Sequence, residues 1–266
     1  METLSARASD GVHLAAYRDG RGVPLYALHG GPATDHRAFG HYLDPATEYA
    51  ELVLLDQRGC GGSDDAPPES YTLERLAADI EDVRAALGHD RFVLLAHSFG
   101  GAVAVRYAIR WPERLLALVL VDASASGWKG PALYLPGWPA WFRAMRAQQK
   151  KGVDFAEFHL AHEVGNPQKR DEVRALLETE VRHDPRRVQP LTSASFRPLP
   201  LRNIVAGVPV WGMYGKVDRR FLGDAWRLRR AGATVVYIND AGHFPFVEQP
   251  EAFNTTLRDI VASRTP

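Results

Sequence analysis

A serine and a histidine in this chain have the residue types and surroundings that acyl transfer requires. Ser98 lies in the segment AHSFG at residues 96–100, between an apolar run and a helical pattern, so its hydroxyl should stand on a sharp turn. His243 follows a later apolar run, and an imidazole can accept a serine proton near neutral pH. We therefore expect Ser98 to be a nucleophile and His243 its general base. A serine that only caps an ordinary helix is the alternative.

The third chemical group should be a carboxylate that orients the histidine and stabilises its protonated form. Asp218 lies between Ser98 and His243 in the chain, which gives the order serine, acid, histidine. Asp122 is the main alternative, because it ends the preceding expected strand at residues 116–121; Asp224 and Asp240 are lesser ones. We expect Asp218 to be the acid, with Asp122 left open as its rival.

A glycine-rich segment, HGGP at residues 29–32, also follows an apolar run. Glycine lets a backbone N–H approach a ligand without obstruction by a Cβ atom. Acyl transfer generates an oxyanion, and fixed N–H donors stabilise it. We expect the N–H groups of Gly31 and Phe99 to form this oxyanion hole, because Pro32 has no N–H to donate. An ordinary turn between a strand and a helix is the alternative.

Short apolar runs alternate with helical patterns over most of the chain, which is typical of a parallel sheet covered on both faces. The chemical segments each follow one of these runs, so the sheet should bring them to one edge. The expected strands are residues 25–28, 52–55, 92–96, 116–121, 208–213 and 234–238; the expected helices are residues 72–87, 100–110 and 250–263, and residues 12–17 predict an edge hairpin.

The alternation stops after residue 122 and resumes after residue 200. Helical patterns at residues 139–151, 153–164 and 168–183 fill the interval. An interval of this length exceeds an ordinary connection between parallel strands. We therefore predict a core made of residues 1–122 and 201–266, with residues 123–200 inserted as a helical cap.

The composition excludes several classes of function. The 266 residues include 32 basic and 32 acidic side chains, so the chain lacks the charge signature of a nucleic-acid binder. No apolar stretch is long enough for a signal peptide or a membrane span, which predicts a cytoplasmic protein with no membrane partner. A single cysteine, Cys60, excludes an internal disulfide. His159 and His162 lack the surrounding pattern of a metal motif, so we expect neither a metal nor a cofactor.

Two segments resemble those of a known family. HGGP at residues 29–32 and DQRGCGGS at residues 56–63 are similar to segments of the proline iminopeptidase branch of the α/β-hydrolases. The resemblance implies an α/β-hydrolase fold, with a mostly parallel eight-stranded sheet flanked by helices and an inserted helical cap. It also implies a cofactor-free acyl-enzyme mechanism with Ser98, Asp218 and His243 as the catalytic triad and the oxyanion hole named above.

The second of these segments has a structural interpretation. Asp56 and Arg58 are expected to pair with each other or to bond the loop backbone, and so to hold the loop near the site. Cys60 lies in the same segment without an evident base, so we expect it to pack rather than to react.

The chain departs from the iminopeptidase pattern around the nucleophile, where that family usually shows GGSWG and this chain has AHSFG. The favoured prediction is an iminopeptidase-like aminopeptidase that releases an N-terminal residue from a short peptide or small molecule. A carboxylesterase or lactonase acting on small apolar acyl substrates is the alternative, and a non-catalytic ligand-binding protein is a third. The sequence indicates no oligomeric state. Candidate substrate contacts in the cap are two carboxylates and an aromatic cluster: Glu157, Glu163, Trp138, Trp141, Phe142 and Phe158.

Overall fold

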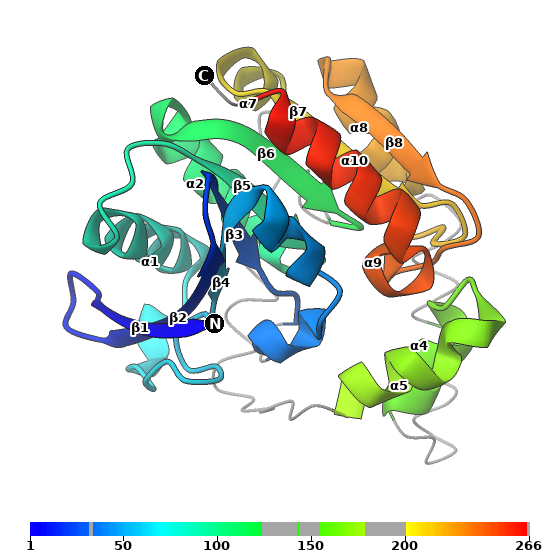
Figure 1. The fold of residues 1–266 in the computed structure, drawn as a ribbon, viewed down its shortest axis with the longest axis horizontal. Helices are drawn as coiled ribbons and strands as arrows, with labels where there is room; N and C mark the ends of the chain where they lie inside the picture. The colour runs from blue at the N-terminus through cyan, green and yellow to red at the C-terminus, as the bar shows by residue number, and fades with distance from the viewer. Residues whose placement is uncertain (32–33, 124–142, 144–154, 179–200, 265–266) are drawn as a thin grey trace.

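A sheet of eight strands forms the centre of the computed structural model (Figure 1). The structure describes residues 1–31, 34–123, 143, 155–178 and 201–264. In sheet order the strands are β1 (Glu2–Arg7), β2 (His13–Gly20), β4 (Ala50–Leu55), β3 (Val23–Leu28), β5 (Phe92–His97), β6 (Leu115–Val121), β7 (Val210–Gly215) and β8 (Thr234–Ile238). β2 pairs antiparallel with both β1 and β4, and the remaining neighbours are parallel. The expected mostly parallel, eight-stranded sheet is confirmed.

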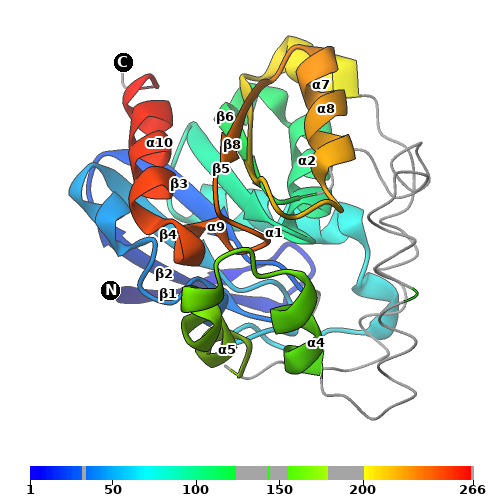
Figure 2. The ribbon, with the colours of Figure 1, turned by 90° about the vertical axis from the view of Figure 1, so that its right-hand side faces the viewer.

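Helices cover both faces of this sheet, which explains why its central strands are apolar throughout. Figure 2 shows α10 (Pro250–Ala262) on one side, and α2 (Gly100–Arg110) and α8 (Leu222–Ala231) on the other. Along β3, Tyr26 and Leu28 pack into the core beneath α1 (Leu73–Ala86) and α2. Leu25 and Ala27 point the opposite way and pack with α10. The alternation of side chains along one strand thus supplies two separate cores.

The helices begin and end close to where the sequence predicts them. Thr72 caps α1, and its side chain accepts a hydrogen bond from the N–H of Arg75. The expected helices at 100–110 and 250–263 correspond to α2 and α10. The remaining helices of the core are α7 (Leu201–Gly207) and α9 (Pro245–Glu248), with short 3-10 turns η1 (His36–Phe39), η2 (Asp44–Glu48), η3 (Pro68–Ser70) and η4 (Pro112–Arg114).

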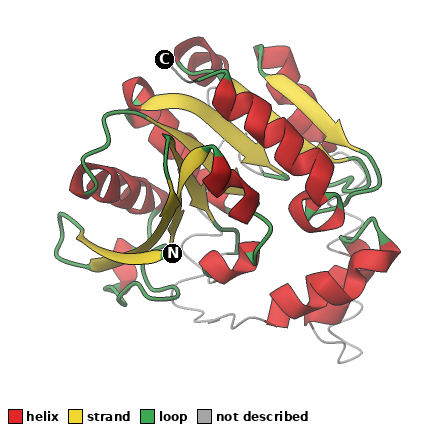
Figure 3. Cartoon of the chain, in the orientation of Figure 1, coloured by secondary structure: helices red, strands yellow, loops and turns green. Residues whose placement is uncertain are grey.

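Two helices from the expected cap lie outside the layers of the sheet domain. They are α4 (Phe155–His162) and α5 (Arg170–Glu178), joined through η6 (Pro167–Lys169), and Figures 1 and 2 place them beside α9. They correspond to the helical patterns at 153–164 and 168–183. The pattern at 139–151 lies outside the described residues, apart from residue 143. Colouring by secondary structure shows the same separation between this helical pair and the strands (Figure 3).

Among the described residues, no helix is both long and apolar enough to cross a membrane.

Candidate active site

Ser98 sits on a tight turn between the end of β5 and the start of α2. Its φ is 52°, in the left-handed region that non-glycine residues seldom adopt. Its N–H donates to the carbonyl of Val121 at 3.0 Å, which fixes the turn against β6. A Cβ atom at Gly100 would lie 2.6 Å from the carbonyl oxygen of His29, so the backbones pass too closely for a larger residue. This strained, tightly packed turn exposes the serine hydroxyl at the edge of the sheet.

The structure brings Ser98, His243 and Asp218 together from three separate segments. Nε2 of His243 lies 3.0 Å from Oγ of Ser98, and Nδ1 lies 3.0 Å from Oδ2 of Asp218. Asp218 follows β7, and His243 follows β8. The parallel strands therefore deliver all three side chains to the same edge.

Two neighbours fix the loop that carries His243. Nε2 of His97 lies 2.8 Å from the carbonyl oxygen of His243, and the ring of Phe221 stacks on the imidazole with centroids 5.3 Å apart. His97 is fully buried, and burial followed by the charge of His243 lowers its pKa to about 3. A neutral His97 can donate its Nε2–H to that carbonyl, which locates the histidine loop. No sequence pattern predicted this role for His97.

Burial and the neighbouring charges together set the pKa values of His243 and Asp218. Burial alone would raise the pKa of Asp218, but Arg220 and His243 outweigh it and hold that pKa well below its ordinary value. Burial is the main cause that lowers the pKa of His243; Arg220 lowers it further, whereas Asp218 and Glu163 raise it. Near neutral pH, Asp218 is therefore an ionised carboxylate and His243 a neutral imidazole.

Asp122 lies close to this pair but has a different environment. Its carboxylate accepts the N–H of Gly215 at 3.1 and 3.0 Å. Burial, and next the charge of Asp218, raise its pKa well above the ordinary value. Oδ2 of Asp218 lies 3.0 Å from Nδ1 of His243, so the geometry favours Asp218 as the acid.

Arg220 is a central residue of the site that the sequence analysis missed. It donates to both carboxylate oxygens of Asp218, at 2.9 and 2.6 Å, and to Glu163 of the segment that follows α4. Its position two residues after Asp218 is only a weak indication of a role in the site, because exposed arginines are common in loops. Only the fold shows that this side chain is buried between two carboxylates.

Of the two expected oxyanion donors, one lines the same pocket as the nucleophile and the other adjoins it in the chain. Gly31 lines the pocket beside Ser98, and Phe99 follows Ser98 in the chain. A Cβ atom at Gly30 would lie 3.0 Å from Cβ of Ser98, which shows how closely the glycine loop approaches the nucleophile. Pro32 lies outside the described residues.

A pocket with an empty volume of about 660 Å³, part of it open solvent, lies over Ser98. Among the described residues it is lined by Gly30, Gly31, Thr34, Asp35, Ala38, His97, Ser98, His159, Glu163, Leu176, Leu177, His243 and Phe244. Both parts of the expected architecture contribute, since His159 and Glu163 belong to α4 and the turn after it, and Leu176 and Leu177 to α5. The exposed wall of the pocket is mainly apolar, and His243 contacts the serine within it.

The structure places the candidate substrate contacts of the cap in different surroundings. Glu163 is buried and lines the pocket. Glu157 lies on the exposed side of α4 and pairs with Arg174. Phe158 is buried and packs against the ring of His162, with centroids 4.6 Å apart. The remaining three candidates, Trp138, Trp141 and Phe142, lie outside the described residues.

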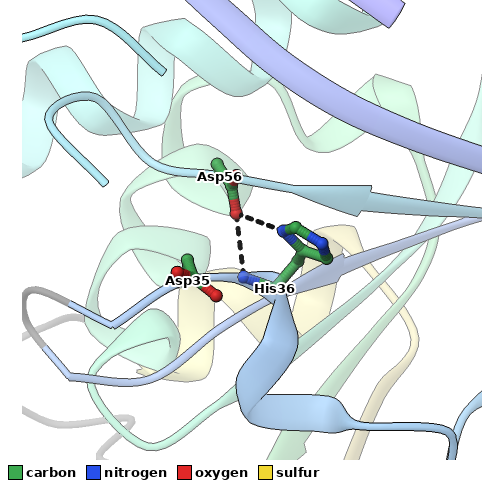
Figure 4. Close-up of side chains that lie close together, drawn as sticks. All are labelled: Asp35, His36 and Asp56. Atoms are coloured by element: carbon green, nitrogen blue, oxygen red, sulfur yellow. Dashed lines mark hydrogen bonds and ion pairs between the residues drawn. The ribbon is translucent and has the colours of Figure 1, made fainter. Parts of the chain in front are cut away.

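The loop at residues 56–63 is held by a cluster of polar side chains (Figure 4). Asp56 is fully buried and accepts hydrogen bonds from the backbone N–H of His36 at 2.8 Å and of Gly62 at 2.8 Å. Its Oδ1 atom also lies 2.9 Å from Nδ1 of His36. Asp35, the third member of the cluster, is paired with Arg37. These oxygens are already engaged by N–H donors, so the cluster fits a structural role and we assign no metal to it.

Arg58 differs from the expectation that it could pair with Asp56. It is buried and donates to Asp79 of α1 at 2.7 and 2.6 Å, and to Asp10 at 2.9 Å. The loop is therefore tied to a helix of the core, while Asp56 bonds the loop backbone. Cys60 is buried within it, in agreement with a packing role.

The comparisons with known proteins agree with this architecture. The family described as alpha/beta hydrolase fold matches residues 23–250. A proline iminopeptidase of Saccharolobus solfataricus is 36% identical over 104 residues, which cover 38% of this chain and 34% of that protein. An epoxide hydrolase 4 of Mus musculus is 38% identical over 104 residues, covering 38% and 29%. The matches thus span about a third of these relatives.

A solved structure matches over nearly the whole chain. The esterase RhEst1 from Rhodococcus is 25% identical, covers 99% of both chains and superposes with a TM-score of 0.77.

Proposed function

We propose that this chain, which belongs to the α/β-hydrolase fold family, is a serine hydrolase. Its reaction would pass through an acyl-enzyme. The observation that carries this proposal is the 3.0 Å contact between Oγ of Ser98 and Nε2 of His243 at a strained strand-to-helix turn. Nucleophile and base lie within hydrogen-bond reach, and Asp218 orients the base from its other side.

In this mechanism His243 takes the proton of Ser98 as its Oγ atom attacks the carbonyl carbon of the substrate. The N–H groups of Gly31 and Phe99 stabilise the resulting oxyanion. The protonated His243 then gives its proton to the leaving group, which departs and leaves an acyl-serine. Water, deprotonated by His243, releases the acid and restores the serine, while Asp218 stabilises the imidazolium in each half of the cycle.

The pocket favours a neutral acyl substrate, so we propose a carboxylesterase or lactonase as the first candidate. An aminopeptidase must hold a substrate ammonium group, which requires an available carboxylate. The two carboxylates that line the described pocket, Asp35 and Glu163, are both paired with arginines, Arg37 and Arg220. The full-length likeness to the esterase RhEst1 supports the same substrate class.

The expected iminopeptidase-like aminopeptidase is the second candidate. The specific observation in its favour is the 36% identity to the proline iminopeptidase of Saccharolobus solfataricus. That match covers only 34% of the relative, and an epoxide hydrolase matches to a similar extent. The matched third therefore does not by itself select a substrate.

The test compares Ser98→Ala with the unaltered chain and with Ser5→Ala, which removes an exposed serine from β1. We expect Ser98→Ala to lower ester turnover by more than about a thousandfold and to lose the mass shift caused by a fluorophosphonate. Ser5→Ala should retain both. Turnover that persists in Ser98→Ala would overturn the mechanism. Absence of any labelling in the unaltered chain would instead support the non-catalytic binding protein.

A parallel comparison of substrates separates the two candidates. Short-chain 4-nitrophenyl esters should be cleaved with a far higher kcat/KM than proline 4-nitroanilide. The two carboxylates that line the described pocket are already paired with arginines, so they are not available to the ammonium group of the proline substrate. A preference for the proline substrate would instead select the iminopeptidase.

A further inference from the structure

A second carboxylate lies behind the acid of the proposed triad. The guanidinium of Arg220 is placed between Asp218 and Glu163, donating to both oxygens of the first and to Oε1 of the second. Each of these three side chains is at least nine-tenths buried. A planar guanidinium is suited to holding carboxylates in a fixed orientation, so this arrangement is rigid.

The pairing of Asp218 with Arg220 alone would oppose the proposed chemistry. The acid of a triad stabilises the imidazolium by its negative charge. A buried arginine on both oxygens of that acid cancels most of this charge, and its own charge repels the imidazolium. Glu163 supplies a second negative charge on the far side of the arginine. The three groups together then carry one net negative charge, and His243 neutralises it when it takes the serine proton.

We propose that Glu163 and Arg220 are positioning residues that form, with Asp218, a carboxylate–guanidinium–carboxylate unit. Arg220 holds the carboxylate of Asp218 toward His243, and Glu163 offsets the charge of Arg220 so that His243 remains an effective base. This inference rests on the serine-hydrolase mechanism proposed above. It means that the inserted segment contributes to the catalytic machinery as well as to the pocket.

Backbone contacts show that Glu163 is built into the histidine loop. The carbonyl oxygen of Glu163 accepts the N–H of His243 at 2.7 Å. A Cβ atom at Gly242 would lie 1.9 Å from that same oxygen, so the approach requires glycine at this position. The backbone of Glu163 thus locates the histidine, while its side chain reaches the arginine that holds the acid.

The charge balance at Glu163 agrees with this role. Burial alone would raise the pKa of Glu163, but Arg220 and His159 outweigh it and lower the pKa to about 2. Nδ1 of His159, on α4, lies 2.6 Å from Oε1 of Glu163. Glu163 is therefore ionised at neutral pH, as the offset of Arg220 requires.

Other titratable groups face His243 from the surrounding elements. Glu248 of α9 accepts the N–H groups of Gly242 and Phe244 at 2.9 and 3.2 Å. Asp122 at the end of β6 lies within the same cluster of groups as Asp218 and His243. The ring of His97 packs against that of His243 with centroids 4.8 Å apart, and His159 contacts Glu163. The substitutions tested below leave these four groups in place.

The test is the pH profile of kcat/KM for ester cleavage in Glu163→Gln and Arg220→Gln. Glu163 raises the pKa of His243 and Arg220 lowers it. Removing the carboxylate should therefore move the acid limb to lower pH, and removing the guanidinium should move it to higher pH. Each variant should lose about tenfold to a hundredfold in kcat, the effect of one charged hydrogen bond, with a smaller change in KM.

Matched controls use exposed neighbours of the same residue types. Glu178→Gln removes an exposed carboxylate from α5, and Arg219→Gln removes an exposed guanidinium next to Arg220. Both should keep the acid limb of the unaltered chain. Arg220→Lys retains the positive charge but loses the fork of donors, so it should keep the acid limb with a reduced kcat.

The double variant Glu163→Gln/Arg220→Gln should place the acid limb between those of the two single variants. Thermal melting confirms that each variant is folded before its profile is read. Acid limbs that stay at the position of the unaltered chain, or that move in one direction for both single variants, would overturn this inference. Failure of the serine mechanism itself is seen separately, as activity that survives in Ser98→Ala.

Discussion

His243 is buried beside the pocket, and this burial sets the pH range in which it can act as a base. Burial is the largest of the causes that lower its pKa below the ordinary value of 6.5. A histidine accepts a proton only when neutral, so a lowered pKa extends the active form to lower pH. We predict that the acid limb of kcat/KM for a non-ionising ester lies below pH 6.5. An acid limb above that value, measured while circular dichroism shows a folded chain, would contradict this assignment.

The same residues show how far the sequence alone reaches. Ser98 and His243 could be proposed from the sequence because each follows an apolar run and has few competitors of its type in such a position. The chain order already favoured Asp218 over Asp122, and the structure adds the 3.0 Å contact between Asp218 and Nδ1 of His243. Arg220 could not be identified, because burial between two carboxylates depends on a segment some 57 residues away in the chain.

At the scale of elements, the start of α2 must lie directly against the glycine loop for the nucleophile turn to form. Gly100→Ala would place a Cβ atom 2.6 Å from the carbonyl oxygen of His29 and 2.8 Å from that of Leu28. Backbone atoms cannot move away from such a contact without a large energetic cost. We therefore predict a loss of about 1–3 kcal/mol in the free energy of unfolding, together with reduced ester turnover. Urea unfolding followed by fluorescence measures the first quantity.

Gly207→Ala is the control for that substitution, because among the described residues its Cβ atom would meet only the side chain of Pro112, at 3.5 Å. It ends α7, where alanine is a better helix former than glycine, so stability should be unchanged or rise by up to about 1 kcal/mol. Equal destabilisation by both substitutions would show that the close approach at Gly100 is unimportant.

Strands that are buried on both faces gave the clearest sequence signal. β5 and β6 are almost wholly buried, so their sequences are continuous apolar runs. β1 was not predicted as a separate strand: it lies at the edge of the sheet with most of its side chains exposed, and its residues carry little apolar signal. The helical patterns of residues 153–164 and 168–183 predicted α4 and α5, but not which of their side chains reach the site.

On the scale of the whole molecule, one buried carboxylate joins the inserted segment to the sheet domain. Oε2 of Glu248 accepts the N–H groups of Gly165 and Asn166 at 2.6 and 2.8 Å, and Oε1 accepts those of Gly242 and Phe244. The segment after α4 and the histidine loop are thus bonded to the same side chain of α9. These hydrogen bonds connect residues that are far apart in the chain, so no local sequence pattern predicts them.

Glu248→Gln tests whether this join supports the site. An amide offers one acceptor oxygen and turns its NH2 group toward N–H donors, so we predict a loss of about 2 kcal/mol in the free energy of unfolding. Because Glu163 and His243 lie on the two segments that Glu248 bonds, kcat for ester cleavage should fall as well. Glu251→Gln, an exposed residue of α10, should change stability by no more than about 0.5 kcal/mol. If Glu248→Gln lowered stability but left kcat unaltered, the segments would keep their alignment without the shared carboxylate.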